Sequence, residues 1–323
     1  MGEFDLIRRF FLRAPGAGTI LGIGDDCALL RPPEAGQALA ISSDMLIEGR
    51  HFFAGTDPAA VGHKSLAVNL SDLAAMGAEP LGFTLAIALP TVDEKWIEAF
   101  CRGMFELAER HTCPLVGGDT TRGPLAISIT VFGQVPPGQA LRRDRAQAGD
   151  EIWVSGPLGG AAFAVAQRAG RSGRGGRVHE PVDERAARRL DWPQPRLALG
   201  RSLRGIAHAA IDLSDGLAGD LRHVLDASAG EDGLAADLAA GDIPLDPCLA
   251  QEPPDQALTF ALRGGDDYEL LFTASADAHQ EVRALCPEAG MIGRLRAGHG
   301  ILLTGRDGAA VPFEGTGFDH FSK

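Results

Sequence analysis

The residues of this chain best suited to chemistry are aspartates that follow short apolar runs and stand beside glycine or serine. A carboxylate at the end of a strand, next to such small residues, is held firmly and is open to a ligand. One such aspartate is ordinary, but six such places predict a site that gathers hard divalent cations to hold polyphosphate. The five runs and one further cluster are Leu21–Asp26, Leu39–Asp44, Val68–Asp72, Leu115–Asp119, Ala210–Asp215 and Gly264–Glu269.

Several of these carboxylates also have a purely structural interpretation. Asp25 and Asp26 follow Gly24, where an aspartate side chain can close a turn on its own backbone. Asp44 follows two serines and is suited to cap a helix. Asp72 is different, because it falls in an expected helix whose same face is largely apolar, where a carboxylate needs a partner or a metal. Asp72 therefore favours a functional interpretation.

Two segments are suited to phosphate. Gly117–Gly123 is dense in small and hydroxyl residues, so its backbone can come close to a phosphate while Arg122 helps to neutralise it. Asp212, Ser214 and Asp215 lie where a strand is expected to give way to a helix, whose N-terminus attracts phosphate and would favour a metal bridge. The sequence has no Gly-x-x-x-x-Gly-Lys-Ser/Thr loop, so ATP would be held through carboxylates and metal.

The chemistry that fits this set is phosphoryl transfer, with several Mg²⁺ ions neutralising the phosphates of ATP. No general base is required if the acceptor is itself a phosphate, which is ionised at neutral pH. Cys27 and Cys113 stand near acidic motifs, but no motif supplies a nucleophile with a histidine base, so we expect no covalent nucleophile. His51 is a lone histidine, and a lone histidine is more often structural.

Composition limits the class of protein. The chain has 323 residues, 45% of them hydrophobic, which is enough for a sizeable core and favours more than one domain. The formal net charge of −13 disfavours nucleic acid as the main partner. Five cysteines without a Cys-x-x-Cys pair indicate reduced thiols and a cytoplasmic protein, and no apolar stretch approaches the ~20 residues of a membrane helix.

The periodicity of apolar residues predicts α/β or α+β layers in both halves of the chain. Thr56-Asp57-Pro58 is a helix start and Gly77 a stop, which places Ser65, Asn69, Asp72 and Met76 on one helix face. We expect further helices at 4–13, 93–111, 159–169, 183–190, 195–204, 216–228 and 276–286. We expect buried strands at 38–43 and 83–89 and further strands at 125–133, 151–155, 208–213, 258–262 and 269–274. Residues 133–149 read as a long connection, and the Arg/Gly-rich stretch 168–180 as a loop.

These motifs together resemble the thiamine-monophosphate kinase family, in order and nearly end to end. The segments that carry the resemblance are Gly22–Leu30, Ser42–Asp44, His51–Phe52, Ala67–Ala78, Gly117–Gly123, Ile211–Leu217 and Gly264–Leu270. The resemblance implies the two-domain aminoimidazole-ribonucleotide-synthetase-like fold. Its N-terminal α/β domain, 1–137, would bind metal and ATP and pair in a homodimer, and its C-terminal α/β domain, 150–323, would complete the site. The implied reaction is ATP-dependent, in-line phosphorylation of thiamine monophosphate to thiamine diphosphate with several Mg²⁺.

Carried over by motif, the resemblance also implies three sets of site residues. The metal set is Asp26, Ser42, Ser43, Asp44, Asp72, Asp119, Asp212 and Asp215. The ATP set is Gly118, Asp119, Arg143 and Ser214. The thiamine-phosphate set is His51, Asp266 and Phe318, and an acid and an aromatic ring suit the thiazolium cation.

The chain departs from the family pattern in places. Asp266 stands where a glutamate is expected, and the stretch 168–180 is not part of the pattern. Two other functions remain open: another ATP-using enzyme of the same superfamily, such as selenophosphate synthetase or aminoimidazole ribonucleotide synthetase, and a non-catalytic metal- or nucleotide-binding protein. A selenophosphate synthetase would be expected to have a reactive cysteine in a Gly-rich N-terminal segment, and no cysteine precedes Cys27.

Overall fold

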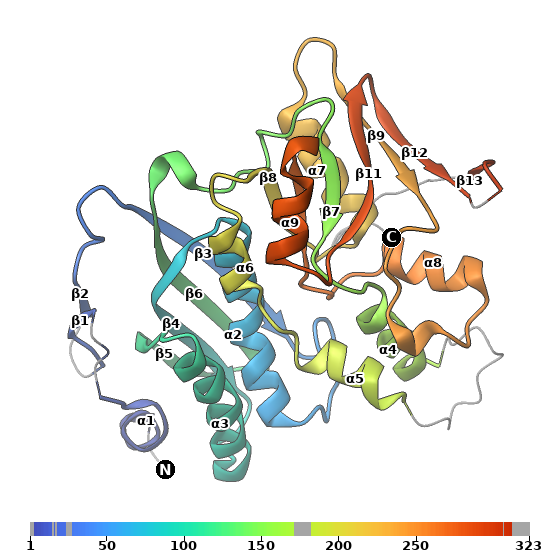
Figure 1. The fold of residues 1–323 in the computed structure, drawn as a ribbon. Helices are drawn as coiled ribbons and strands as arrows, with labels where there is room; N and C mark the ends of the chain where they lie inside the picture. Colours follow the sequence, from blue (N-terminus) through green and yellow to red (C-terminus); the bar gives the residue numbers. More distant parts are fainter. Residues whose placement is uncertain are drawn as a thin grey trace. The chain divides into compact units, whose positions relative to one another are not determined.

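A computed structural model describes residues 3–14, 16, 18–23, 28–170, 182–305 and 307–311. Asp26, Phe318 and most of the Arg/Gly-rich stretch lie outside the described residues. The chain divides into two compact units (Figure 1). The first comprises Met1–Leu73 and Ala78–Gly138, and the second comprises Ala74–Gly77 and Gln139–Lys323. Within the described part, no helix is both long enough and apolar enough to cross a membrane.

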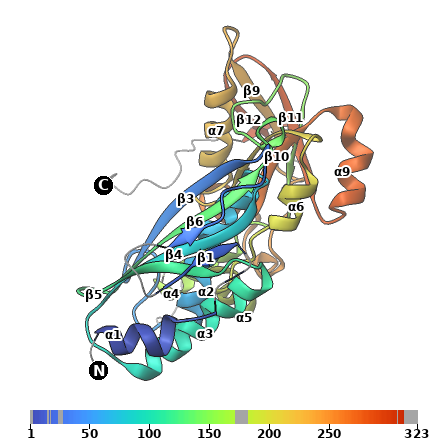
Figure 2. The same cartoon turned by 90° about the vertical axis from the view of Figure 1, so that its left-hand side faces the viewer.

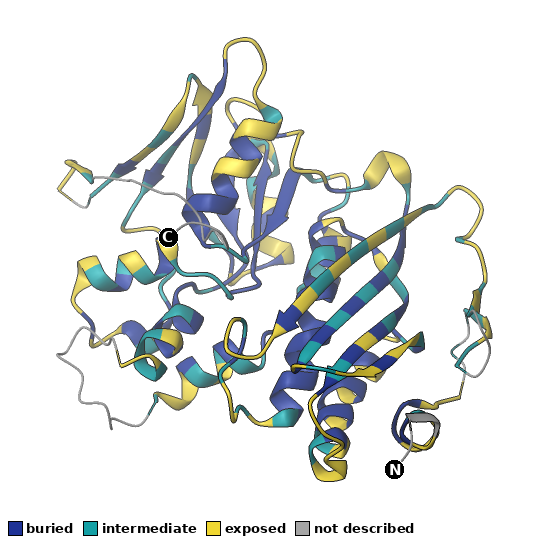
Figure 3. Cartoon of the chain, turned by 180° about the vertical axis from the view of Figure 1, so that it is seen from behind, coloured by how far each residue is buried: buried dark blue, intermediate teal, exposed yellow. Residues whose placement is uncertain are grey.

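The elements up to the boundary between the units include a two-stranded sheet, β1-β2, and a four-stranded sheet with helices on one face. In chain order they are α1 (Glu3–Leu6), the π-helix η1 (Ile7–Phe11), β1 (Thr19–Leu21), β2 (Leu29–Leu30), β3 (Ala38–Ile47), α2 (Pro58–Ala75), β4 (Glu79–Leu89), α3 (Glu94–Arg110), β5 (Leu115–Arg122), β6 (Ala126–Val135) and η2 (Pro137–Gln139). The sheet order is β3-β6-β4-β5, and only the β4–β5 pair is parallel. The helices α2 and α3 cover one face, and Figure 3 shows the sheet from the face that they leave uncovered.

Local signals in the sequence account for the position of α2. The side chain of Asp57 accepts a hydrogen bond from the Ala59 N–H at 3.0 Å, and Pro58 occupies the first turn. Gly77 adopts φ +62° just after the helix, a conformation that favours glycine. The expected helix is therefore confirmed to within one or two residues.

The second unit is built on a seven-stranded sheet of order β13-β12-β9-β11-β7-β10-β8. Its strands are β7 (Glu151–Val154), β8 (Ala207–Asp212), β9 (Leu234–Ala239), β10 (Leu270–Ala274), β11 (Gly290–Ala297), β12 (Gly300–Thr304) and β13 (Ala310–Val311). Its helices are α4 (Gly160–Arg168), α5 (Glu184–Asp191), α6 (Leu197–Ser202), α7 (Leu217–Ser228), η3 (Pro247–Leu249), α8 (Pro254–Arg263), η4 (Ala276–Ala278) and α9 (His279–Leu285).

Alternation along the strands gives this sheet two apolar faces. Ile152 and Val154 of β7 belong to a large buried cluster with residues of α7, whereas Trp153 points the other way. The Trp153 ring stacks on Phe272 and contacts His279 of α9, with 5.0 Å between the Trp153 and His279 ring centroids. Figure 2 shows the sheet between α7 and α9.

Two sequence expectations are wrong. Residues 258–262 form part of α8 rather than a strand, because Pro254 starts a helix at its first position and Asp255 stands in the first turn, where the helix dipole favours an acid. The expected buried strand at 38–43 is the longer β3, which is exposed at every second residue. Furthermore, β9, β11 and β12 were not expected at all.

Candidate functional site

The expected placement of aspartates at strand ends is correct for Asp212, the last residue of β8. It is wrong for Asp44 and Asp119, which lie inside β3 and β5. Asp72 lies inside α2, as expected. The sequence therefore identified acidic positions but not always their place in the elements.

The first unit brings β3 and α2 together through a small polar cluster. The Ser42 hydroxyl donates a short hydrogen bond to the carboxylate of Asp72. The backbone N–H of Asp44 donates to the side-chain oxygen of Asn69 at 3.0 Å, and the Asn69 amide donates to the Ser65 carbonyl at 3.0 Å. Residues 42, 44, 69 and 72 thus join one strand to one helix.

Electrostatics set Asp44 apart within this cluster. Burial first, and the negative charge of Asp72 second, together raise the pKa of its carboxyl group from 3.8 to about 6. A half-buried carboxylate beside a second carboxylate is stabilised by a bound cation. The pair is therefore suited to a hard metal ion.

Ser43 has a different environment from its neighbours. Side chains alternate along a strand, so Ser43 faces away from Ser42 and Asp44. Its hydroxyl lies 3.0 Å from the Thr130 hydroxyl and donates to the Ile129 carbonyl at 3.2 Å. Only the backbone of Ser43 is therefore available on the face that carries Asp72.

The other predicted residues of the first unit lie on β5 and in the turn after β3. Gly118 has φ +153°, and a Cβ atom there would lie 1.9 Å from the Leu85 carbonyl oxygen, so only glycine fits. Its neighbour Asp119 is exposed on the edge strand. His51 accepts a hydrogen bond from the Ile47 N–H through Nδ1 at 2.9 Å, which places the proton of the neutral ring on Nε2.

In the second unit, the segment after β8 is held against the segment before β10. The N–H groups of Asp266 and Tyr268 donate to the carbonyls of Ser214 and Leu213 at 3.0 and 2.8 Å. The Leu213 N–H in turn donates to the Glu269 carbonyl at 2.8 Å. These three bonds bring the predicted residues Ser214 and Asp266 together, close to Asp212 and Asp215 in the chain.

Asp220 of α7 is a functional candidate that the sequence reasoning missed. Its carboxylate accepts the Asp215 N–H at 3.1 Å, and the Ser214 N–H also bonds to it. Burial raises the pKa of Asp220 to about 7, while the charge of the predicted ATP residue Arg143 acts to lower it. The available signal was its position four residues after Gly216, one helical turn into α7.

Among the residues that the structure describes, no three His, Cys, Asp or Glu side chains are close enough together to hold one metal ion.

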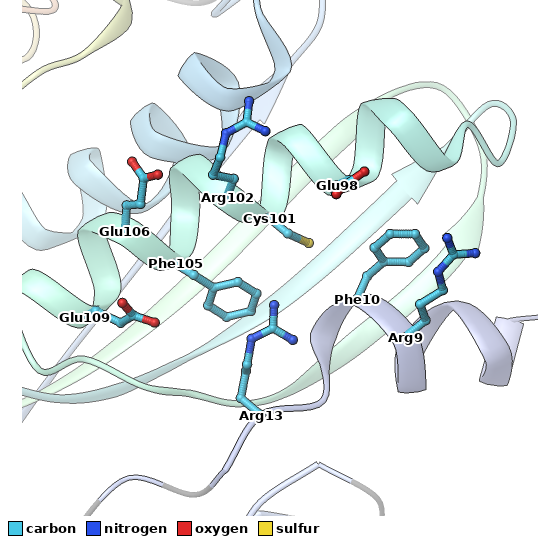
Figure 4. A pocket seen from close by; sticks show the side chains of 9 residues that line it. All are labelled: Arg9, Phe10, Arg13, Glu98, Cys101, Arg102, Phe105, Glu106 and Glu109. Carbon is cyan, nitrogen blue, oxygen red and sulfur yellow. The ribbon is translucent and has the colours of Figure 1, made fainter.

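The first unit also has a groove of about 520 Å³ between η1 and α3 (Figure 4). The Arg13 guanidinium lies 4.2 Å from the centroid of the Phe105 ring there. None of the predicted site residues lines this groove, which is formed by Arg9, Phe10, Arg13, Glu98, Cys101, Arg102, Phe105, Glu106 and Glu109.

Comparison with known proteins identifies the family. Residues 24–135 match the model of the AIR synthase related protein, N-terminal domain. Thiamine-monophosphate kinase from Salmonella typhimurium is 44% identical over 329 residues, covering 99% of this chain and 98% of the relative. The chain belongs to the thiamine-monophosphate kinase family.

Solved structures agree with this assignment. Thiamine-monophosphate kinase from Stenotrophomonas maltophilia K279a is 47% identical, with a TM-score of 0.82 and coverage of 91% of this chain and 93% of that chain. AaThiL complexed with AMPPCP and TMP is 29% identical, with a TM-score of 0.76 and coverage of 89% and 88%. The expected α/β fold of thiamine-monophosphate kinases is therefore confirmed.

Proposed function

We infer that this chain phosphorylates thiamine monophosphate to thiamine diphosphate with ATP as the donor. The family supports the reaction, since relatives that span nearly the whole chain are thiamine-monophosphate kinases. AaThiL, with the same fold, is complexed with AMPPCP and TMP. The observation that supports the site is the half-buried pair Asp44 and Asp72, with the Ser42 hydroxyl of β3 donating to Asp72 of α2.

The oxygen ligands of this pair fit Mg²⁺. Mg²⁺ in phosphate-transferring sites is commonly bound by one or two carboxylates, with substrate phosphates and water completing its shell. Burial and the repulsion from Asp72 raise the pKa of Asp44, and a bound cation would offset both effects by stabilising the ionised carboxylate. We propose that the metal ligands come from Asp26, Ser42, Ser43, Asp44, Asp72, Asp119, Asp212 and Asp215, with Ser43 contributing through its backbone. When bound, Mg²⁺ would neutralise the phosphate charge during transfer.

The remaining residues of the proposed site bind and orient the two substrates. Gly118 has no side chain, so a phosphate of ATP could come close to its backbone. Ser214 and Arg143 would contact ATP. His51, with its proton on Nε2, can donate to a phosphate oxygen, and Asp266 and Phe318 would face the thiamine part. The acceptor phosphate carries its own negative oxygen, so orientation rather than proton removal is the task of the chain.

We also propose that the enzyme is a cytoplasmic homodimer. Four described cysteines are free thiols, and ATP is a cytoplasmic substrate. On β3, the apolar side chains Leu39, Ile41, Met45 and Ile47 are 49%, 59%, 54% and 38% exposed along one face of the strand. A regular apolar strand face of this kind fits a second copy of the same chain.

The reaction is tested by incubating the protein with ATP, Mg²⁺ and thiamine monophosphate. We expect equal amounts of ADP and thiamine diphosphate. ATP turnover without thiamine diphosphate would favour another ATP-using enzyme of the superfamily. Nucleotide binding without any turnover, by folded protein with Mg²⁺ present, would favour a binding protein instead.

A further inference from the structure

The loop between α8 and β10, Gly264–Glu269, has an unusual backbone. Asp266 and Tyr268 have φ values of +67° and +49°, a left-handed backbone conformation that residues other than glycine rarely adopt. Two such residues, separated by one position, persist only where the surrounding structure determines them strongly.

Buried carboxylates at the alternate positions supply this constraint. The Gly159 N–H donates to both carboxylate oxygens of Asp267, at 3.1 and 3.0 Å, and Asp267 is only 4% exposed. Glu269 accepts from Arg196 at 2.7 and 2.6 Å and from the Ser155 hydroxyl at 2.5 Å. Residues 267 and 269 therefore anchor the loop in the core of the second unit.

The positions between the anchors carry a side-chain hydrogen bond. The phenol of Tyr268 donates to Oδ1 of Asp266 at 3.0 Å. Tyr268 is only 9% exposed, whereas Asp266 is half-buried. The phenol is thus held by packing, and it fixes one oxygen of a carboxylate that is more open to a ligand.

We propose that Tyr268 is a positioning residue that orients the Asp266 carboxylate toward the cationic thiamine part of the substrate. The proposal rests on the proposed function of the same site. The aspartate has a shorter arm than the glutamate expected there, and the phenol restricts its rotation. A fixed carboxylate loses less conformational freedom when it binds a cation, so its effect is on substrate affinity.

The first test is Tyr268→Phe, which removes only the hydroxyl. We expect the KM for thiamine monophosphate to rise about tenfold, the effect of one hydrogen bond to a charged group. The kcat and the KM for ATP should stay within about twofold, because the phenol bonds to Asp266 and is not among the residues proposed to bind metal or ATP. Ser202→Ala is the control, since the Ser202 hydroxyl donates to the Ala198 carbonyl of its own helix and Ser202 is not among the proposed site residues. Unchanged KM for thiamine monophosphate in Tyr268→Phe would overturn the proposal.

A double-mutant cycle separates positioning from a general structural effect. In an Asp266→Ala background the phenol has no carboxylate to orient, so Tyr268→Phe should change the KM by less than about twofold. An equal effect of Tyr268→Phe in both backgrounds would show that the phenol acts independently of Asp266.

Tyr268 is the single tyrosine of the chain, so tyrosine labelled with carbon-13 at the ring carbon that bears the hydroxyl gives one NMR resonance. We expect this resonance to shift in Asp266→Ala and, in the wild type, on addition of thiamine monophosphate. A resonance that does not shift in Asp266→Ala would contradict the contact between Tyr268 and Asp266, whether or not the protein turns over substrate. Absence of wild-type turnover, with the resonance still responding to Asp266→Ala and thiamine monophosphate, would instead count against the proposed reaction alone.

Discussion

At the scale of single residues, Asp44 has a titration that should be visible in protein stability. Its pKa is about 6 in the folded protein against 3.8 as the ordinary value. A raised carboxyl pKa means that folding favours the protonated form of Asp44. The stability that this protonated form adds to the folded protein is complete below pH 3.8 and is lost as pH rises through about 6. We expect the free energy of unfolding of metal-free wild type to fall by at most about 3 kcal/mol over this window.

Denaturant unfolding at several pH values measures this change. Asp44→Asn should remove the decrease, and Mg²⁺ added to the wild type should restore stability at the upper end of the window. Asp242→Asn, at an exposed position of the second unit, is the matched control and should keep the wild-type dependence. The same pH slope in Asp44→Asn and wild type would contradict the assignment.

Asp72 is expected to matter for catalysis more than for folding. Asp72→Asn keeps the shape of the side chain and a hydrogen-bond acceptor for Ser42, but it removes the charge that a metal requires. We expect kcat to fall by about three orders of magnitude, comparable to the loss of an essential electrostatic contact, with thermal unfolding little changed. A near-normal rate in Asp72→Asn and in Asp44→Asn would remove the argument for a carboxylate metal site.

At the scale of elements, the sequence predicted α2 well because a capping side chain and a proline mark its start, and the Asp57 cap is present in the structure. The expected helix at 93–111 is α3, which begins after a cap by Asp93. It did not predict β9, where Leu234–Ala239 contains too many alanines to form a strongly apolar run. The contact of Ser42 with Asp72 joins a strand and a helix thirty positions apart, and packing alone determines such a pairing. Sequence patterns therefore named the acidic residues but not their partners.

The loop before β10 leads to a prediction about stability. Burial would raise the pKa of Glu269, but the hydrogen bonds and charge of Arg196, together with the charge of Arg189, lower it overall. Arg196→Ala leaves a buried carboxylate short of a partner and should destabilise the second unit by about 3–5 kcal/mol. Because the pKa of Glu269 is lowered, its contribution should be present above its ordinary pKa of 4.5 and lost as pH falls.

The matched control is Arg296→Ala, which breaks a pair with Asp237 whose side chains are 47% and 45% exposed. We expect this exposed pair to contribute less than about 1 kcal/mol. Chemical unfolding of both variants measures the difference. Equal losses in the two variants would show that burial does not determine the effect of the Glu269 pair.

At the scale of the whole molecule, the candidate residues are divided between the two units. Residues 42–119 of the set belong to the first unit, and residues 143, 212–215 and 266 belong to the second. The proposed dimer concerns only the first unit, because the exposed apolar residues of β3 lie on the face opposite to Ser42 and Asp44. Dimerisation and metal binding can therefore be disturbed separately.

Ile41→Glu tests the dimer. A buried, unpaired carboxylate in an apolar interface is costly, so we expect this variant to be monomeric at concentrations where the wild type is dimeric. Sedimentation equilibrium measures the molecular mass of each. Leu302→Glu is the control, because Leu302 is 42% exposed on β12 of the second unit and should leave the dimer intact. A wild type that sediments as a monomer would contradict the proposed dimer, and a dimeric Ile41→Glu would place the interface elsewhere.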